Sequence, residues 1–186
     1  EFSLGWGQTG IIGKVGLKFT NFSVRNLFGK NRIHRGIIPQ GDGQELEISA
    51  STNGSYYQSY SISFLDPWFG RKRPNQLSVS AFFSRQTDIS SSYYNSSYYN
   101  SYESFYDPDK SVQMYGLSVM FGKRLRWPDD YFTFTASLSY QRYVLKDWQY
   151  FPVTNGKSNN ISLELTLARN SVDNPIFPRY GAEFSF

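Results

Sequence analysis

The sequence has no cysteine and a single histidine, His34, among its 186 residues. Thiolates and imidazoles are the usual protein ligands of zinc, so their near absence argues against a zinc centre. The chain also lacks a Gly-rich phosphate loop and any evident pairing of a nucleophile with a base. The sequence therefore predicts a protein that is not an enzyme, with no catalytic residue, no metal and no cofactor.

Long hydrophobic runs are also missing, since no stretch approaches the roughly 18 apolar residues that a membrane-spanning helix needs. This argues against spanning by a helix but not by strands, in which only every second residue has to be apolar. Aromatic residues, in contrast, make up 19% of the chain, with 15 Tyr, 16 Phe and 4 Trp. Such rings collect at both membrane interfaces of outer-membrane barrels.

The net charge of +4 comes from 19 basic residues that are spread along the chain. Because no recognition motif accompanies this charge, we expect no nucleic-acid partner. The chain opens on Glu1 without a signal peptide or a start Met. We therefore expect a segment that was processed or excised from a longer protein.

A period of two runs through most of the sequence and is clearest between residues 131 and 141. One set of alternate positions is apolar: Phe132, Phe134, Ala136, Leu138 and Tyr140. The intervening set is polar: Thr133, Thr135, Ser137, Ser139 and Gln141. The same alternation places Leu163 and Leu165 opposite Glu164. This pattern predicts strands with one face toward lipid and the other toward a hydrated lumen.

Nine strands are expected, at residues 2–8, 13–24, 44–54, 56–67, 75–88, 111–125, 131–147, 157–171 and 180–186. No convincing helix is found. Because the connections are too short for crossovers, the predicted fold is an all-β antiparallel meander, a transmembrane β-barrel. The whole chain, 1–186, is then one partial transmembrane β-barrel domain.

The connections between these strands are of two kinds. Compact ones, rich in Pro, Gly and aromatic residues, lie at Asp66–Gly70, Trp127–Asp130 and Asn174–Gly181. They alternate with polar loops at Ser90–Lys110 and Asp147–Lys157. Short turns on one rim and long loops on the other are typical of bacterial outer-membrane barrels, with short turns in the periplasm and long loops outside. The segment Gly29–Gly43 departs from this rule, because it is long but lies on the short-turn rim.

A water-soluble β-sandwich or lipocalin-like barrel is the alternative, with its apolar face inward. Three features favour the membrane. The strands are close to the roughly 9–11 residues that span a bilayer, aromatic residues lie at strand ends, and the polar face carries Glu45, Glu47 and Glu164. Carboxylates beside Ser and Thr suit a hydrated lumen.

The opening strand is unusual, because EFSLGWGQTG has three glycines in ten residues. Glycine weakens a strand and removes the side chains that hold its register. One interpretation is a point of curvature at a barrel seam. The other is a poorly paired edge that accepts a foreign strand. The candidate strand-pairing residues are Phe2, Ser3, Leu4, Gly5, Trp6, Gly7 and Gln8.

Three motifs, in this order after the Gly-rich strand, resemble the BamA family of outer-membrane protein insertases. The first is Asn26-Leu27-Phe28-Gly29, similar to that family's Asn-Leu-Phe-Gly turn. The second is Ser63-Phe64-Leu65-Asp66-Pro67-Trp68-Phe69. The third is Asp173-Asn174-Pro175-Ile176-Phe177-Pro178-Arg179-Tyr180-Gly181, similar to its Asn-Pro-x-Phe-Pro-x-x-Gly turn. The Tyr/Ser-rich loops and the long Gly29–Gly43 segment resemble the Bacteroidetes branch.

The resemblance implies a Gram-negative protein that folds β-barrel clients into the outer membrane as part of the BAM complex. It implies the N-terminal half of a sixteen-stranded barrel, with lipid, client proteins and accessory subunits as partners. The opening strand would then be the lateral gate. The periplasmic POTRA domains of the family are absent from this chain. The alternative is a complete small barrel that acts as a porin or adhesin, because the chain ends on an aromatic residue.

Overall fold

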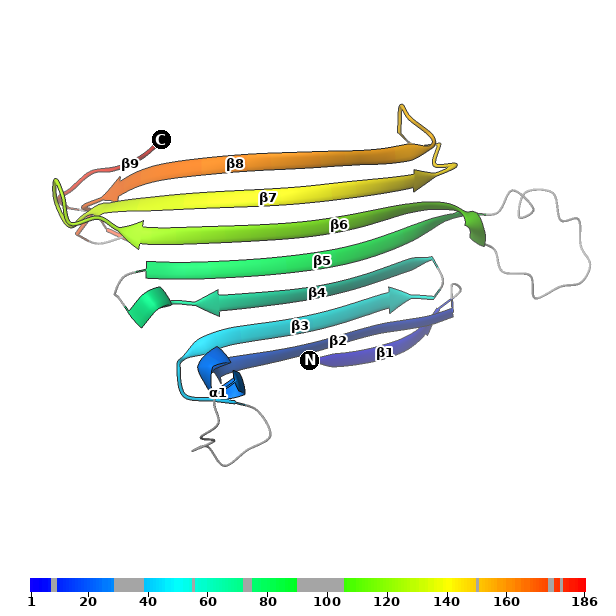
Figure 1. Cartoon of the computed structure of the whole chain (residues 1–186), viewed down its shortest axis with the longest axis horizontal. Helices are drawn as coiled ribbons and strands as arrows, with labels where there is room; N and C mark the ends of the chain where they lie inside the picture. Colours follow the sequence, from blue (N-terminus) through cyan, green and yellow to red (C-terminus); the bar gives the residue numbers. More distant parts are fainter. Residues whose placement is uncertain are drawn as a thin grey trace, which may run out of the picture.

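The computed structural model describes residues 1–7, 10–28, 39–54, 56–71, 75–89, 106–149, 151–173, 176–177 and 179–186. Its strands form one antiparallel sheet in which each strand pairs with its neighbours in sequence. The nine strands lie side by side in a single layer (Figure 1). They are β1 (Phe2–Gly7), β2 (Gly10–Phe22), β3 (Gln44–Asn53), β4 (Tyr57–Asp66), β5 (Asn75–Ile89), β6 (Tyr106–Arg124), β7 (Phe132–Lys146), β8 (Gly156–Asn170) and β9 (Glu183–Ser185).

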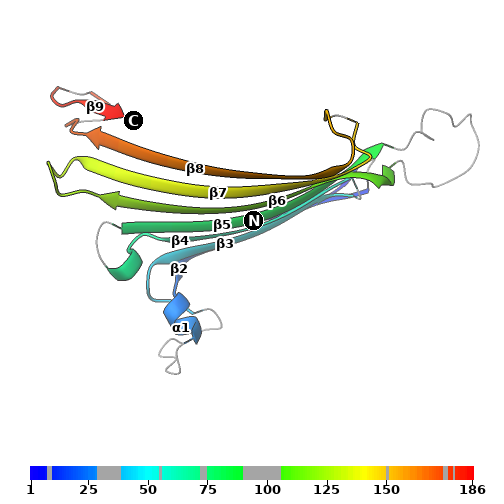
Figure 2. The ribbon, with the colours of Figure 1, turned by 45° about the horizontal axis from the view of Figure 1, so that its top comes forward.

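The nine strands and the meander order agree with the prediction, and the bounds of most strands differ by only a few residues. The sheet is an open one: β1 forms one edge, and β9 pairs with only the last residues of β8. Two short helical segments were not predicted. They are α1 (Val24–Phe28) and η1, a 3-10 turn at Phe69–Arg71. Both lie at the end of the sheet where the short connections gather (Figures 1 and 2).

The register separates an apolar face from a polar face. Across the middle of the sheet, apolar residues stand opposite one another from strand to strand: Phe19, Leu46, Phe64, Val79, Val119, Leu138 and Leu163. The polar face carries an adjacent row made almost wholly of serine: Ser63, Ser80, Ser118, Ser139 and Ser162. A shift of one residue between two strands would place apolar residues beside polar ones. The observed register avoids this, so apolar residues lie on one side of the sheet and polar residues on the other.

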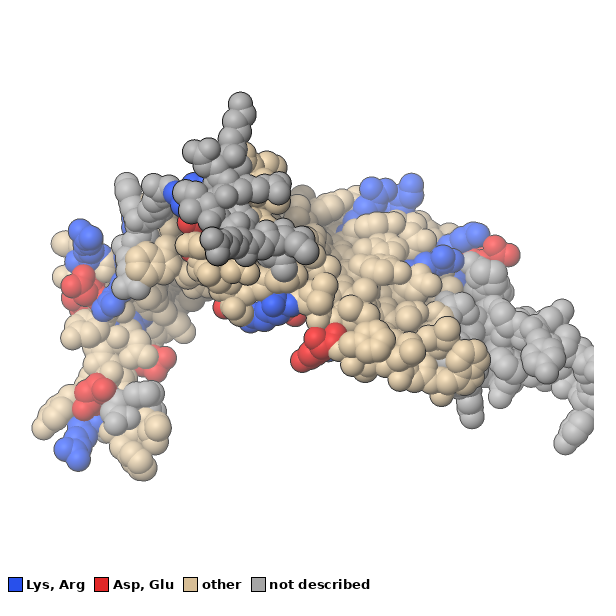
Figure 3. Space-filling model, turned by 90° about the horizontal axis from the view of Figure 1, so that it is seen from below, with Lys and Arg blue, Asp and Glu red and all other residues tan. Residues whose placement is uncertain are grey.

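The two faces also differ in chemistry and in solvent exposure. On β4, Tyr60 and Ile62 of the apolar face are 50% and 46% exposed, whereas Ser59, Ser61 and Ser63 of the polar face are half-buried. Serine hydroxyls pair across strands, with Oγ–Oγ distances of 2.7 Å for Ser80–Ser118 and 2.6 Å for Ser139–Ser162. Seen from the β1 side, the molecule is arched, and charged side chains lie along its hollowed underside (Figure 3).

On the polar face, the ring of Phe82 on β5 covers Gly116 on β6. The two residues are directly opposed, and a Cβ atom at Gly116 would lie 2.0 Å from the ring. An aromatic ring over a strand glycine shelters backbone that would otherwise be left bare.

We expect Gly116→Ala to lower the free energy of unfolding by about 0.5–1 kcal/mol, because the new methyl group displaces the ring from its cross-strand partner. In a Phe82→Ala background the same change should be neutral or stabilising, because alanine suits a strand better than glycine does. Urea unfolding of the full-length protein in lipid vesicles measures both values. An equal cost in the two backgrounds would contradict this role for the ring.

Candidate functional site

The opening strand lies at a sheet edge, where it pairs with β2 alone. Its register runs from Phe2 opposite Val15 to Gly7 opposite Gly10. Among the described residues, no segment pairs with its other side. Within the described residues β1 is therefore an edge strand. Its role as the acceptor of a foreign strand stays a prediction. Gln8, the last of the candidate pairing residues, lies outside the described residues.

The hydrogen bonds determine which backbone groups of β1 point away from the sheet. Glu1 and Gly16 exchange both bonds, with N–O distances of 2.7 and 2.8 Å. In an antiparallel ladder such hydrogen-bonded pairs alternate with pairs whose N–H and C=O groups point outward. Ser3, Gly5 and Gly7 therefore bond to β2, whereas Phe2, Leu4 and Trp6 direct their amides to the free edge.

A bond on the far side of β2 supports this assignment. Ile11 stands opposite Trp6, and its carbonyl accepts a hydrogen bond from the Gly54 N–H at 2.7 Å, on the β3 side. Since the N–H and C=O groups of Ile11 point toward β3, those of its partner Trp6 point away from β2, to the free edge. The free edge thus offers three N–H and three C=O groups, from Phe2, Leu4 and Trp6.

Pairing between β1 and β2 is poor in side-chain contacts. Three of the six pairs contain glycine: Leu4–Gly13, Gly5–Ile12 and Gly7–Gly10. The ten pairs between β4 and β5, in contrast, contain none. Each missing cross-strand pair removes roughly 0.2–1 kcal/mol. Gly13 of β2 thus adds to the effect of Gly5, Gly7 and Gly10, the three glycines already counted in the opening ten residues.

Phe2, Leu4 and Trp6 of β1 have side chains on the apolar face that are very exposed, at 74%, 69% and 82%. An edge with free main-chain groups and exposed apolar side chains can add an extended strand. Main-chain hydrogen bonds would supply the affinity without selecting strongly for sequence.

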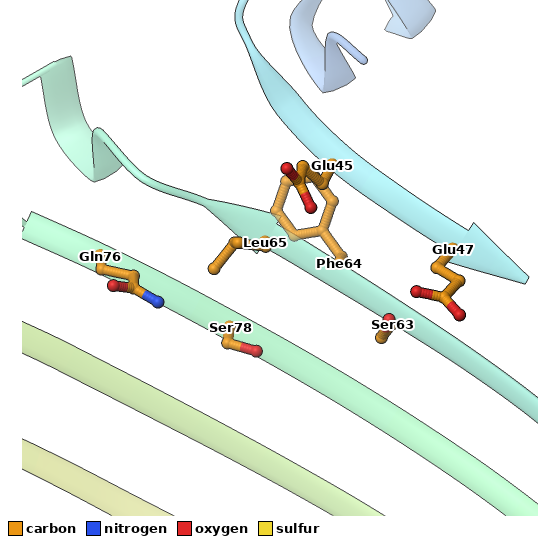
Figure 4. A pocket seen from close by; sticks show the side chains of 7 residues that line it. All are labelled: Glu45, Glu47, Ser63, Phe64, Leu65, Gln76 and Ser78. Atoms are coloured by element: carbon orange, nitrogen blue, oxygen red, sulfur yellow. The ribbon is translucent and has the colours of Figure 1, made fainter. Parts of the chain in front are cut away.

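On the polar face, acidic residues gather near the short-turn end of the sheet. Glu45 and Glu47 project from β3 beside Ser63 and Leu65 of β4 (Figure 4), around a cavity of about 270 Å³. Lys18 of β2 forms an ion pair with Glu45, with Nζ 3.0 Å from Oε2. Glu164, the third predicted interior carboxylate, shares this face through its pairing with Ser137.

The first sequence motif differs from the prediction. Asn26, Leu27 and Phe28 form the end of helix α1 instead of a turn, and Gly29 lies outside the described residues. The helix begins after the fully buried Ser23, whose Oγ accepts the Asn26 N–H at 3.1 Å. The same hydroxyl donates to Asp42. A serine N-cap with a distant carboxylate partner thus stabilises a helix too short to show a sequence period.

The second motif lies next to the first. Asp66 ends β4, and its carboxylate accepts both the Trp68 N–H at 2.9 Å and the Gln44 side-chain N–H at 2.9 Å. Gln44 in turn accepts the N–H of Val24 at 2.8 Å. Pro67 and Phe69 complete the turn. Between the motifs is a cavity of about 810 Å³, lined by Arg25, Gly41, Asp42, Gly43, Gln44, Asp66, Trp68, Phe69 and Gly70.

The third motif lies at the same end of the sheet, next to the β9 strand (Figure 1). Asp173 holds its turn, because its carboxylate accepts the N–H groups of Arg179 and Tyr180 at 2.9 and 3.1 Å. Gly181 has a φ of 107°, and a Cβ there would lie 2.1 Å from the Ser171 carbonyl, so only glycine fits. Phe177 is exposed. Asn174, Pro175 and Pro178 lie outside the described residues.

A single-layer antiparallel sheet with one apolar and one polar face is consistent with part of the wall of an outer-membrane β-barrel. The Omp85 superfamily domain model matches residues 40–186. The chain therefore belongs to the Omp85 superfamily, which indicates an outer-membrane protein that acts in protein insertion or transport. The match starts beyond β1 and β2. No curated protein matches the chain.

Within the described part of the chain, no helix is both long and apolar enough to cross a membrane.

Proposed function

We propose that this protein is a non-enzymatic insertase that folds β-barrel clients into the outer membrane, with β1 as its lateral gate. The observation that carries this proposal is the free edge of β1, where Phe2, Leu4 and Trp6 offer unpaired main-chain groups beside glycine-rich pairing. A client's terminal strand would add to this edge, and its sequence would matter little because backbone groups form the bonds.

The sequence motifs support the BamA family within the superfamily, and the Bacteroidetes branch within that family. The present strands would then be the N-terminal half of a sixteen-stranded barrel in the BAM complex. The apolar face meets lipid, the polar face lines the lumen, and accessory subunits bind the short-turn end. That end lies in the periplasm, and the long loops are extracellular.

A photo-crosslinking amino acid at Leu4 of the full-length protein should capture nascent outer-membrane proteins in cells, because Leu4 lies at the centre of the free edge. Position 62 is the matched control. Ile62 is likewise an exposed residue of the apolar face, but its strand is paired on both sides, with Ile48 and Ala81. Client adducts of equal yield at both positions would contradict a gate at β1.

Protein transport through the lumen is the second function that superfamily membership allows. Here clients would pass along the serine row of the polar face. A third crosslinker, at Ser139, separates the two functions. Adducts at Ser139 without adducts at Leu4 would favour transport.

A further inference from the structure

Three basic residues gather on the apolar face near the long-loop end of the sheet. Arg85 lies on β5, Arg142 on β7 and Lys157 on β8. The register places Arg142 opposite Asn159, so Lys157 is its diagonal neighbour across the β7–β8 ladder. Side chains in this relation lie about 7–8 Å apart at their backbones, within reach of one shared ligand.

A cavity of about 490 Å³ opens on this face, lined by Gln113, Tyr115, Tyr140, Arg142, Val144 and Lys157. Its two tyrosines are fixed by hydrogen bonds, from Tyr140 to the Asn159 side chain at 2.8 Å and from Tyr115 to that of Gln113 at 3.1 Å. No acidic residue lines the cavity. Its polar lining therefore presents positive charge and hydrogen-bond donors.

One nitrogen of each arginine lacks a hydrogen-bond partner in the described part of the structure. The Nε atoms of Arg85 and Arg142 are both buried without a hydrogen bond. A buried donor that stays unpaired costs about 1–3 kcal/mol. Arg169, at the short-turn end of the same face, forms an ion pair within the protein. Its guanidinium nitrogen lies 3.0 Å from the Asp129 carboxylate.

From the cavity toward the middle of the sheet, the residues of the apolar face are apolar. Leu117, Ile161 and Leu163 are 48%, 70% and 66% exposed on the same face. A ligand that fits both regions has anionic groups above long apolar chains. Guanidinium groups bind phosphate with two donors each, and aromatic residues suit the boundary between headgroups and acyl chains.

We propose that Arg85, Arg142 and Lys157 form a binding site for the phosphate groups of a phosphorylated lipid in the leaflet next to the long loops. The site goes beyond client insertion. It rests on the apolar face meeting lipid, as in the proposed function, but not on strand addition at β1. A protein with a blocked gate should therefore still bind the lipid, so the two proposals can fail separately.

The test measures binding of diphosphoryl lipid A to the full-length protein by native mass spectrometry from detergent. The double variant Arg142→Gln/Lys157→Gln should bind at least about tenfold more weakly, because two positive charges near the headgroups are lost. Lys123→Gln/Arg126→Gln is the control, since it makes the same change in charge near the other end of the sheet. Arg142→Lys/Lys157→Arg keeps the charge and should keep the binding, which excludes misfolding as the cause.

Two further probes identify the source of the phosphate. Lipid A without phosphate groups should bind the native protein and the double variant equally. Inorganic phosphate should not compete with the lipid, because it lacks the acyl chains that occupy the apolar rows. Equal binding of diphosphoryl lipid A by the native protein and the double variant would overturn the proposal. Equal weakening by the control variant, or full competition by inorganic phosphate, would also overturn it.

Discussion

Replacing Leu4 with proline should slow client insertion at least about tenfold while the barrel stays folded. Proline has no N–H, and the N–H of Leu4 points to the free edge, so no β1–β2 bond is lost. The carbonyl of an incoming strand that would accept the N–H of residue 4 would then have no donor. Leaving this carbonyl unpaired costs about 1–3 kcal/mol. Insertion of a client into vesicles by the purified full-length protein measures the rate.

Ser3→Pro is the matched control, because it removes an N–H that bonds to β2 and leaves the outward groups of Leu4 in place. This variant should loosen β1 but still insert clients at close to the normal rate. Leu4→Ala tests the side chain alone and should also retain insertion. If Ser3→Pro and Leu4→Pro are equally impaired, the effect comes from disruption of the strand, and the outward amides are not the binding groups.

This pair of variants could not have been designed from the sequence. The glycines of EFSLGWGQTG indicated a weak strand, and the period of two assigned its faces. Which amides point outward depends on the register with β2, and that register rests on the reciprocal bonds between Glu1 and Gly16. Gly13 lies beyond EFSLGWGQTG, so its effect on the edge appears only once the register places it opposite Leu4.

The strands themselves were largely predictable, because each alternates long enough for a period of two to stand out. The misses have local causes. Helix α1 has five residues, and the Asp42 partner of its N-cap lies 19 positions away. Strand β6 begins at Tyr106, five residues before the predicted start, and this stretch contains Pro108, a residue type that strands rarely contain. It pairs there with β5 beyond a register shift at Thr87–Asp88.

The basic site could not be predicted from the sequence either, because its residues are far apart along the chain. Arg85, Arg142 and Lys157 are separated by 57 and 15 positions in the sequence (142 − 85 and 157 − 142). Each one looks like an ordinary solvated charge at the end of a strand. They come together because three neighbouring ladders, β5–β6, β6–β7 and β7–β8, are in register. Long-range sheet pairing, and not the local pattern, creates this site.

The two faces of the sheet should respond very differently to charge at the same depth. Leu138 is 51% exposed on the apolar face, between Val119 and Leu163. An arginine there would place its guanidinium in hydrocarbon, and we expect Leu138→Arg to lower the free energy of unfolding by about 2–4 kcal/mol. Denaturant unfolding of the full-length protein in lipid vesicles measures this value.

The neighbouring position provides the control. Ser137 lies on the polar face opposite Glu164, so Ser137→Arg places the same charge beside a carboxylate in a hydrated lumen. Its cost should stay below about 1 kcal/mol, as for other lumen substitutions. Because residues 137 and 138 are adjacent, both arginines start from nearly the same depth, and only the direction of the side chain differs. Equal costs at both positions would mean that the apolar face does not meet lipid, and the headgroup site proposed on that face would fail with it.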